Sequence, residues 1–380
     1  MIYLTPRPEH GPNGEGPGAA GHVMSVLDES GRPDPKTDPQ LDLALVKRMY
    51  VAMARARSID QRLTRLQRQG RIGFHVGAEG EEAAIVASAA AMRPQDWLFP
   101  CYREVAAALW RGLPLQAYID NMYGNANDLP LGRQMPDHIT GRDVHFASVT
   151  APIGTQITQA VGFSWAGKLR QLDQVTGVYF GDGATSANDF HAGMNFAGVY
   201  KTPTVFLLRN NGWAISVPSS NQSACERYAD KAIGYGIPAV RCDGNDALAV
   251  YKVVDSAVRR AAAGGGPTLV ELLTYRLGPH TTSDDPTVYR DKGAVTEAEM
   301  RDPIPRLRKY LAGKGAWSEA DQQRLDEEVA HDLQQAITRA EEAPAPSIES
   351  MFEDVYERVP GHLHEQQAEC VAGPRAHKRH

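Results

Sequence analysis

The stretch VTGVYFGDGA, residues 175–184, decides the fold that this sequence predicts. An apolar, β-rich run (Val175–Phe180) ends at the turn Gly181-Asp182-Gly183, and a helical pattern follows at Asn188–Tyr200. A second apolar run, Thr204–Leu208, then ends at Arg209-Asn210-Asn211. Because strands that alternate with helices form parallel sheets covered on both faces, the sequence predicts an α/β fold. Ligands of such sheets bind at the carboxyl ends of the strands, where both polar turns fall.

The flanking sequence extends this alternation and adds helices at both ends of the chain. Apolar residues at one-face spacing predict a helix over Leu41–Gln69 with Gly70 as its C-cap. Val23–Val26 is expected to enter a short hairpin. The stretch Gly124–His145 is expected to be a surface loop. The other predicted elements are helices at Gly80–Met92, Glu104–Trp110, Leu115–Tyr123, Thr155–Gln171, Asp246–Ala262, Ile304–Leu311 and Ser318–Glu342, and a strand at Thr268–Tyr275.

The predicted organisation has four parts. Residues 1–21 are rich in Gly and Pro and are expected to form a disordered arm. Residues 22–300 are expected to form the α/β domain, with a helical N-terminal extension. Residues 301–365 are expected to form a C-terminal helical region, and residues 366–380 a flexible tail.

Composition excludes several classes of function. The chain has 380 residues and a net charge of −6, so it lacks the basic field that holds nucleic acid. Its four cysteines form no CxxC pair, which argues against a zinc cage or a disulfide framework. The first twenty residues contain no apolar core of a signal peptide, and no apolar run is long enough to span a bilayer. These features favour a cytoplasmic protein that does not bind membranes.

The two polar turns carry the chemistry that the sequence predicts. Gly181 and Gly183 let the backbone approach a diphosphate closely and offer amide donors to it. The start of the following helix adds a positive dipole end. Asp182 offers a carboxylate to a hard cation, and Asn211 offers an amide oxygen from the next strand end. Mg²⁺ prefers a few protein oxygens together with phosphate oxygens.

Gly-Asp-Gly, then 26 residues (184 through 209), then Asn210-Asn211 resembles the thiamine diphosphate motif. An ordinary βα turn is the alternative interpretation. The resemblance covers about residues 22–365 and points to the alpha subunits of branched-chain 2-oxo acid dehydrogenases, which implies a thiamine diphosphate-binding fold. The matching stretches are Tyr102-Arg103-Glu104, Gly132–Pro136, Gly181–Ala184, Arg209–Ser216, Asp243–Asp246, Thr274–Arg276, Gly278–Asp285 and Met351–Tyr356.

The resemblance assigns roles to residues in these stretches. The cofactor would be bound by Tyr102, Arg103, Ala151, Ile153, Gly181, Asp182, Gly183, Ala184, Arg209, Asn211 and His280. Mg²⁺ would be held by Asp182, Asn211 and the backbone carbonyl of Trp213, where the family usually has Tyr. Thr150, Pro152, Thr155 and Gln156 match a potassium-binding turn. His280 would be catalytic in acyl transfer to the lipoyl group, and Arg276 would order its loop.

Ordinary structural roles remain open for several of these side chains. Arg103 could pair with nearby carboxylates, Arg276 could form a loop salt bridge, and His280 could be a surface histidine. His75 could face the substrate channel or be structural. His138 is a weaker candidate, and His191 is expected to pack on the apolar face of its helix.

No glutamate matches the residue that activates the cofactor in this family, and only the diphosphate half of the site is recognisable. The resemblance therefore implies a beta subunit that completes the site in an α₂β₂ heterotetramer. The implied reaction is decarboxylation of a 2-oxo acid, with thiamine diphosphate as the electron sink. Reductive acylation of a lipoyl group on an acyltransferase core follows. Thr281 and Asp291 stand where the animal enzymes carry phosphorylated serines, which favours a bacterial source.

Other functions remain open at this point. Pyruvate or acetoin dehydrogenase alpha subunits share the main motifs, although GRQMP and TSDDP favour branched-chain substrates. A non-catalytic scaffold paralogue is a second alternative. Such a paralogue would not need Asp182, Asn211, Arg209 and His280, so the presence of these residues argues against it. A nucleotide-binding module would require GxGxxG or GxxxxGK[ST] after a strand, and neither occurs at these strand ends.

Overall fold

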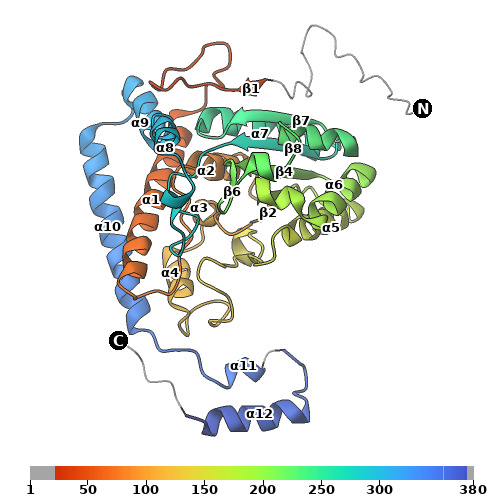
Figure 1. Ribbon diagram of the computed structural model, residues 1–380, viewed down its shortest axis with the longest axis vertical. Helices are drawn as coiled ribbons and strands as arrows, with labels where there is room; N and C mark the ends of the chain where they lie inside the picture. The colour runs from red at the N-terminus through yellow and green to blue at the C-terminus, as the bar shows by residue number, and fades with distance from the viewer. Residues whose placement is uncertain (1–21, 354, 375–380) are drawn as a thin grey trace.

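A computed structural model describes residues 22–353 and 355–374. Its centre is a six-stranded parallel sheet in the order β1-β7-β8-β4-β3-β2 (Figure 1). The predicted α/β fold with a mostly parallel sheet and helical extensions is therefore confirmed. The strands are β1 (Val23–Met24), β2 (Trp97–Phe99), β3 (Thr176–Gly181), β4 (Thr204–Asn210), β7 (Ala239–Asp243) and β8 (Thr268–Leu273), and a separate antiparallel pair joins β5 (Trp213–Ala214) to β6 (Val217–Pro218).

Alternate residues of the central strands enter two cores, one on each face of the sheet. On one face Tyr179, Leu207 and Val270 pack with helices α1, α2 and α7. On the other face Phe180 and Phe206 pack with α5, α6 and the 3₁₀ segment η4 (Tyr228–Tyr235). The strands can be apolar throughout because both faces are covered. The helices named here are α1 (Leu43–Arg68), α2 (Glu82–Ala91), α5 (Thr155–Leu169), α6 (Asn188–Tyr200) and α7 (Ala247–Ala262).

The N-terminal extension is built on α1, whose ends follow from local sequence. The Asp42 side chain accepts a hydrogen bond from the Ala44 backbone as N-cap. Gly70 adopts a left-handed φ of 71°, and its N–H bonds the Gln67 carbonyl. The predicted helix with Gly70 at its end is thus confirmed. Helices α3 (Val105–Trp110) and α4 (Leu115–Tyr123) follow, also as predicted.

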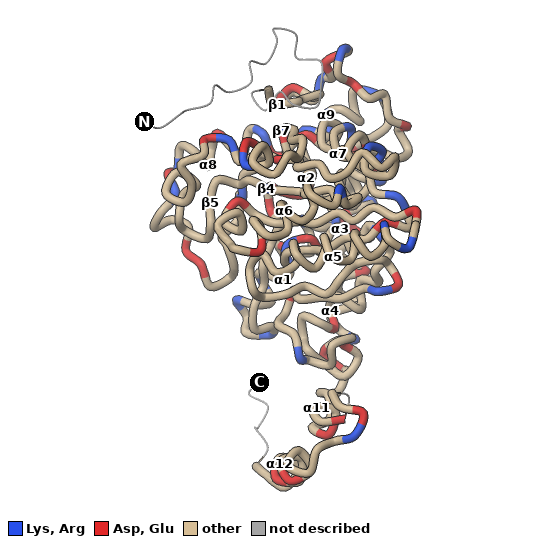
Figure 2. The backbone as a smooth tube through the Cα atoms, turned by 90° about the vertical axis from the view of Figure 1, so that its right-hand side faces the viewer, with Lys and Arg blue, Asp and Glu red and all other residues tan. Residues whose placement is uncertain are grey.

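The C-terminal helices pack along α1 and then leave the body of the molecule. Helix α10 (Glu319–Glu342) begins at a capping box formed by Ser318 and Asp321, and it runs beside α1 (Figure 1). Beyond it, α11 (Ser350–Glu353) and α12 (Gly361–Ala372) form an arm that projects from the body in both views (Figures 1 and 2). The other helices in this region are α8 (Lys292–Glu299) and α9 (Pro303–Gly313).

Several expectations from the sequence need correction. The turn at Asp28–Gly31 does close, and Leu27 bridges Pro33. Val23–Met24, however, pairs in parallel with β7 instead of with the hairpin partner. The cause is Asp246, which caps α7 and also accepts hydrogen bonds from the Val26 and Leu27 backbone.

Two more differences concern the loop 124–145 and the C-terminal tail. The loop is not confined to the surface, because Asp128, Asp137, His138 and Ile139 are buried in it. The tail expected from residue 366 begins inside α12, which continues to Ala372. Residues 1–21 and 375–380, where the disordered arm and the end of the tail were expected, lie outside the described residues. No helix of the described part is long and apolar enough to cross a membrane.

Candidate active site

The carboxyl ends of β3, β4 and β8 lie side by side and bring the predicted site residues together. Gly181 is the register partner of Arg209, and Asn210 is the partner of Leu273. Asp182 therefore lies next to Asn211, and Arg276 follows the third strand. Glycine is needed at position 183 because a Cβ there would lie 2.7 Å from the Ala214 Cβ.

Asp182 and Asn211 form a small group of oxygen ligands. Asp182 is buried, and its Oδ2 accepts a hydrogen bond of 2.8 Å from the Ser219 hydroxyl. Its Oδ1 is buried and has no hydrogen-bond partner among the described residues. The Asn211 Oδ1 accepts only from the backbone of Trp213, at 3.1 Å. Burial raises the pKa of Asp182, and the hydrogen bond from the Ser219 hydroxyl opposes the rise.

The unpartnered Asp182 oxygen fits a cation, because a buried carboxylate oxygen needs a donor or a metal. No group of three or more His, Cys, Asp or Glu side chains suited to a metal occurs among residues 22–353 and 355–374. A site of one carboxylate and one amide suits Mg²⁺, which usually keeps several water or phosphate ligands.

Three buried guanidinium groups lie near Glu81, the carboxylate that contacts Asn211. Arg209, from β4, pairs with Glu81 through Nη1 and with Glu104 through Nη2. Glu81 also accepts a hydrogen bond of 2.9 Å from the Asn211 amide. The positive charge of Arg209, followed by that of Arg103, lowers the pKa of Glu81 against the effect of burial. Sequence analysis did not identify Glu81 or assign a role to Glu104, because nothing in the sequence indicates that they are buried against Arg209.

His280 lies between the other two arginines. Its Nδ1 is 2.8 Å from Arg103 Nη2 and 3.2 Å from Arg276 Nη1. A guanidinium can only donate, so Nδ1 is the acceptor and the imidazole proton lies on Nε2. Burial and the two positive charges lower the pKa of His280 to about 3. His280 is therefore neutral, and the Tyr102 ring meets it edge to face at a centroid distance of 6.0 Å.

The loop that carries His280 is held by its own side chains. Asp284 accepts hydrogen bonds from the His280 backbone (2.7 Å) and from the Tyr289 hydroxyl (2.6 Å). Arg276 donates to the Tyr289 hydroxyl and to the Ile215 carbonyl. Arg276 is thus buried and joins Tyr289 of this loop to the Ile215 carbonyl. Asp284 and Tyr289 were not predicted to contribute.

The segment 150–156 lies at the edge of the site. Ala151, Pro152 and Ile153 are exposed, and Ile153 retains 47% of its accessible surface. Gln156 is buried and donates to the Tyr179 carbonyl, whereas Thr150 Oγ1 is buried without a partner. Ala184 lies in η2 (Asp182–Ser186), a short 3₁₀ turn, so helix α6 begins only at Asn188. Ala151 and Ile153, which were expected to contact the cofactor, therefore face solvent in this chain.

The other histidines have separate roles in the structure. His75 is buried beside Asp137 and Asp60. His138 is buried next to the Pro136 carbonyl. His191 is exposed, so the prediction that it packs is wrong: it lies on the outer side of α6 and contacts Tyr235.

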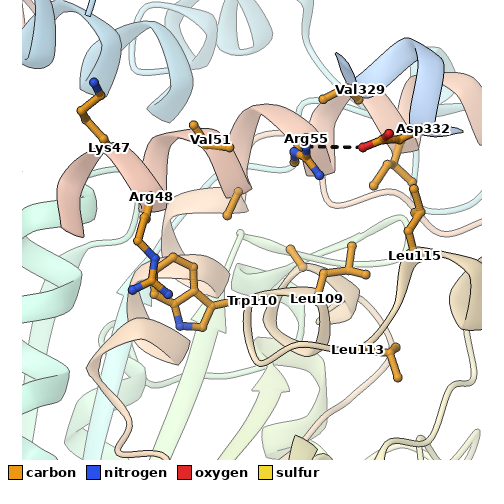
Figure 3. A pocket seen from close by; sticks show the side chains of 13 residues that line it. Lys47, Arg48, Val51, Arg55, Leu109, Trp110, Leu113, Leu115, Val329 and Asp332 are labelled. Atoms are coloured by element: carbon orange, nitrogen blue, oxygen red, sulfur yellow. Dashed lines mark ion pairs between the residues drawn. The ribbon is translucent and has the colours of Figure 1, made fainter. Parts of the chain in front are cut away.

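A separate groove of about 440 Å³ lies between α1, the α3–α4 region and α10 (Figure 3). Its walls are mostly apolar but include charged side chains: Arg48 stacks over Trp110, and Arg55 pairs with Asp332. None of the residues predicted at the strand ends lines it. The volume of a groove therefore does not show where the candidate active site of this chain lies.

A match to a family model identifies the class of protein to which this chain belongs. The chain belongs to the dehydrogenase E1 component family, whose model matches residues 50–349, so it is a member of an oxidoreductase family. Enzymes of this family depend on thiamine diphosphate.

Several individual proteins are similar to this chain over most of its length. The chain is similar to the mitochondrial 2-oxoisovalerate dehydrogenase subunit alpha of Homo sapiens, at 41% identity over 91% of this chain and 78% of that protein. It is also similar to the mitochondrial 2-oxoisovalerate dehydrogenase subunit alpha 1 of Arabidopsis thaliana. The two sequences are 42% identical over 90% of this chain and 73% of that protein. The Caenorhabditis elegans subunit alpha is 41% identical to this chain, over 94% of this chain and 82% of that protein. These relatives are named as mitochondrial proteins of eukaryotes and contradict the expectation of a bacterial cytoplasmic protein.

Proposed function

We propose that this chain is the alpha subunit of a 2-oxoisovalerate dehydrogenase that binds thiamine diphosphate through Mg²⁺. The observation that carries the proposal is the buried, unpartnered Asp182 Oδ1 beside Asn211, at the strand ends of a chain from this family. Asp182, Asn211 and the Trp213 carbonyl would hold Mg²⁺. The bound cofactor would supply the electron sink for decarboxylation of a branched-chain 2-oxo acid.

The charge of the site supports joint binding of metal and diphosphate. The guanidinium groups of Arg103, Arg209 and Arg276 are balanced by the carboxylates of Glu81, Glu104 and Asp182, and all six side chains are buried. A diphosphate entering alone would bring uncompensated negative charge into this site. Mg²⁺ would neutralise much of it, so we expect the diphosphate to bind far more strongly with the metal than without it.

His280 would serve the reaction as a donor through Nε2–H. The positive charges that lower its pKa come from Arg103 and Arg276. A diphosphate beside Arg103 would offset part of that charge and raise the pKa of His280 toward the range of a useful acid. The same residue can then give a proton to the lipoyl group during acyl transfer. Tyr102, Arg103 and Arg209 would contact the diphosphate, with the backbone of Gly181, Gly183 and Ala184.

A beta subunit would complete the site. Ala151 and Ile153, the proposed cofactor contacts, are exposed, and so are the apolar side chains of Ile215 and Val217 beside Ala214, which lies against Gly183. Exposed apolar surface beside a site is typical of a protein interface. The buried Glu81 and Glu104 are committed to Arg209, so we assign the activating glutamate to the beta subunit of an α₂β₂ heterotetramer. A lipoyl-bearing acyltransferase core would receive the acyl group.

We also propose that K⁺ binds at Thr150, Pro152, Thr155 and Gln156. The support from geometry is the buried Thr150 Oγ1, which lacks a hydrogen-bond partner. Replacing NaCl by KCl at constant ionic strength should raise the melting temperature of the wild type but not of the Thr150→Val variant. Equal shifts in both proteins would contradict the potassium site.

The proposed function is tested by calorimetric titration of thiamine diphosphate, with and without Mg²⁺, into the chain co-expressed with its beta partner. Binding should require the metal and both chains, and Asp182→Ala should abolish it. Asp255→Ala is the matched control, because Asp255 forms an exposed pair with Arg259 on α7. Turnover of 2-oxoisovalerate against pyruvate then tests the substrate.

Each outcome of this titration decides a separate part of the proposal. Binding that survives Asp182→Ala would contradict the metal site. Absence of binding with the partner present would favour a non-catalytic scaffold. Faster turnover of pyruvate would retain the cofactor but replace the branched-chain assignment.

A further inference from the structure

The turn His75–Ala78, between α1 and α2, contacts the candidate active site in two places. The His75 N–H donates to the Thr282 hydroxyl at 3.1 Å, and the Thr282 N–H donates to the His75 carbonyl at 3.0 Å. Arg103, which binds His280 Nδ1, also donates to the Gly77 carbonyl. The turn therefore supports both the loop that carries His280 and an arginine that fixes the imidazole.

Two carboxylates hold this turn from the other side. Asp137 is fully buried and accepts hydrogen bonds from the Val76 N–H (2.7 Å) and the Tyr118 hydroxyl (2.6 Å). Asp60, on α1, accepts from the Ala78 N–H at 2.7 Å. The His75 ring lies between them, with Nδ1 3.2 Å from Asp137 and Nε2 3.4 Å from Asp60.

The charge of the ring explains why this arrangement is stable. His75 is 1% exposed, so a neutral ring would leave two carboxylates in a largely buried pocket without a cation. Burial lowers the pKa of His75, but the negative charges of Asp137 and Asp60 and the hydrogen bond with Asp137 outweigh it and raise the pKa to about 10. Tyr118, from α4, is the other titratable group that contacts the pair, through Asp137. The ring is an imidazolium at neutral pH.

We propose that His75 is a positioning residue for His280, acting through the turn that it fixes between Asp60 and Asp137. The imidazolium holds the two carboxylates in place, and the carboxylates hold the turn. The backbone of this turn then holds Thr282 and Arg103. The catalytic meaning of this arrangement rests on the proposed function, but the positioning is a property of the free chain.

Hydrogen–deuterium exchange of the purified, cofactor-free chain tests the proposal, read on peptides that cover residues 278–291. His75→Gln removes the cation and leaves both carboxylates. We expect exchange in these peptides to accelerate about tenfold at pH 8, within the range of coupling between neighbouring groups. Exchange in α7 should not change, whereas a general loss of stability would accelerate it as well.

A second variant separates positioning from simple loss of packing. The double variant His75→Gln/Asp137→Asn replaces one of the two facing carboxylates by a neutral amide. Most of the protection against exchange should therefore return. His145→Gln is the control, since His145 bonds the Pro94 carbonyl away from the turn.

Two results would overturn the proposal: wild-type exchange in His75→Gln, or a double variant that exchanges as fast as the single one. Neither depends on cofactor binding. A failed titration with thiamine diphosphate and Mg²⁺ would contradict the proposed function while leaving the exchange result intact.

Discussion

Replacing Arg209 by Met should destabilise the chain strongly, because Arg209 is the common partner of two buried carboxylates. Glu81 and Glu104 are 0% and 1% exposed, and each pairs with one nitrogen of the guanidinium. Breaking a buried ion pair by removing one partner costs about 3–5 kcal/mol. Glu81 keeps its bond from Asn211, and Glu104 keeps one from the Cys101 backbone. We therefore expect a loss near the middle of that range.

The assay is urea unfolding followed by circular dichroism at pH 7.5. The triple variant Arg209→Met/Glu81→Gln/Glu104→Gln should recover much of the loss, because neither carboxylate is left buried without Arg209. The deficit of the single variant should also shrink toward pH 5, since without Arg209 burial raises the pKa of Glu81 and favours its protonated form. Arg259→Met is the control, with an expected change below about 0.5 kcal/mol for an exposed pair.

Either of two outcomes would refute this reasoning. One is a single variant as stable as the wild type at pH 7.5. The other is a triple variant no more stable than the single one, which would mean that the methylenes and shape of Arg209 matter more than its charge.

The remaining predictions concern three other positions. Because the pKa of His75 rises from 6.5 unfolded to about 10 folded, its contribution to stability is complete below pH 6.5 and is lost as pH rises toward 10. The urea stability of the wild type relative to His75→Gln should thus fall by roughly 1.4 kcal/mol per pH unit across that window, and a constant difference would contradict the pairing. Gly183→Ala should cost about 1–3 kcal/mol, measured by the same unfolding assay, because its Cβ would overlap Ala214; an unchanged midpoint would show that the turn yields freely. His280 should give ¹⁵N signals of a neutral Nε2–H imidazole from pH 5 to 9 without cofactor, and titration near pH 6.5 would contradict its contacts with Arg103 and Arg276.

The interior of the fold was predictable because its strands are apolar on both faces. Val175–Phe180 and Thr204–Leu208 were recognised as strands for that reason, and they became β3 and β4. Strand β7 was missed because it contains Arg241, whose charge is matched by Glu271 on the neighbouring strand. Pairing of that kind depends on tertiary contacts, so a local pattern does not reveal it.

The site was predictable where residues follow strands and unpredictable where they are held by distant partners. Asp182 and Asn211 come directly after β3 and β4, so their proximity follows from parallel topology. Glu81 and Glu104 lie 128 and 105 residues from Arg209 in sequence, and only the folded chain shows the pairing. His280 and Arg276 were identified through resemblance, because their loop has no strong local signal.

The lengths of the outermost strands have a consequence for how this chain behaves without a partner. A long strand at the margin of a sheet exposes unpaired backbone groups to which another polypeptide can add. Here the margins are β1 and β2, which span two and three residues. They offer little template for strand addition. If the isolated chain self-associates, uncovered apolar side chains such as Ile153 and Ile215 should be responsible, and the aggregates should retain native helix content instead of becoming fibrous.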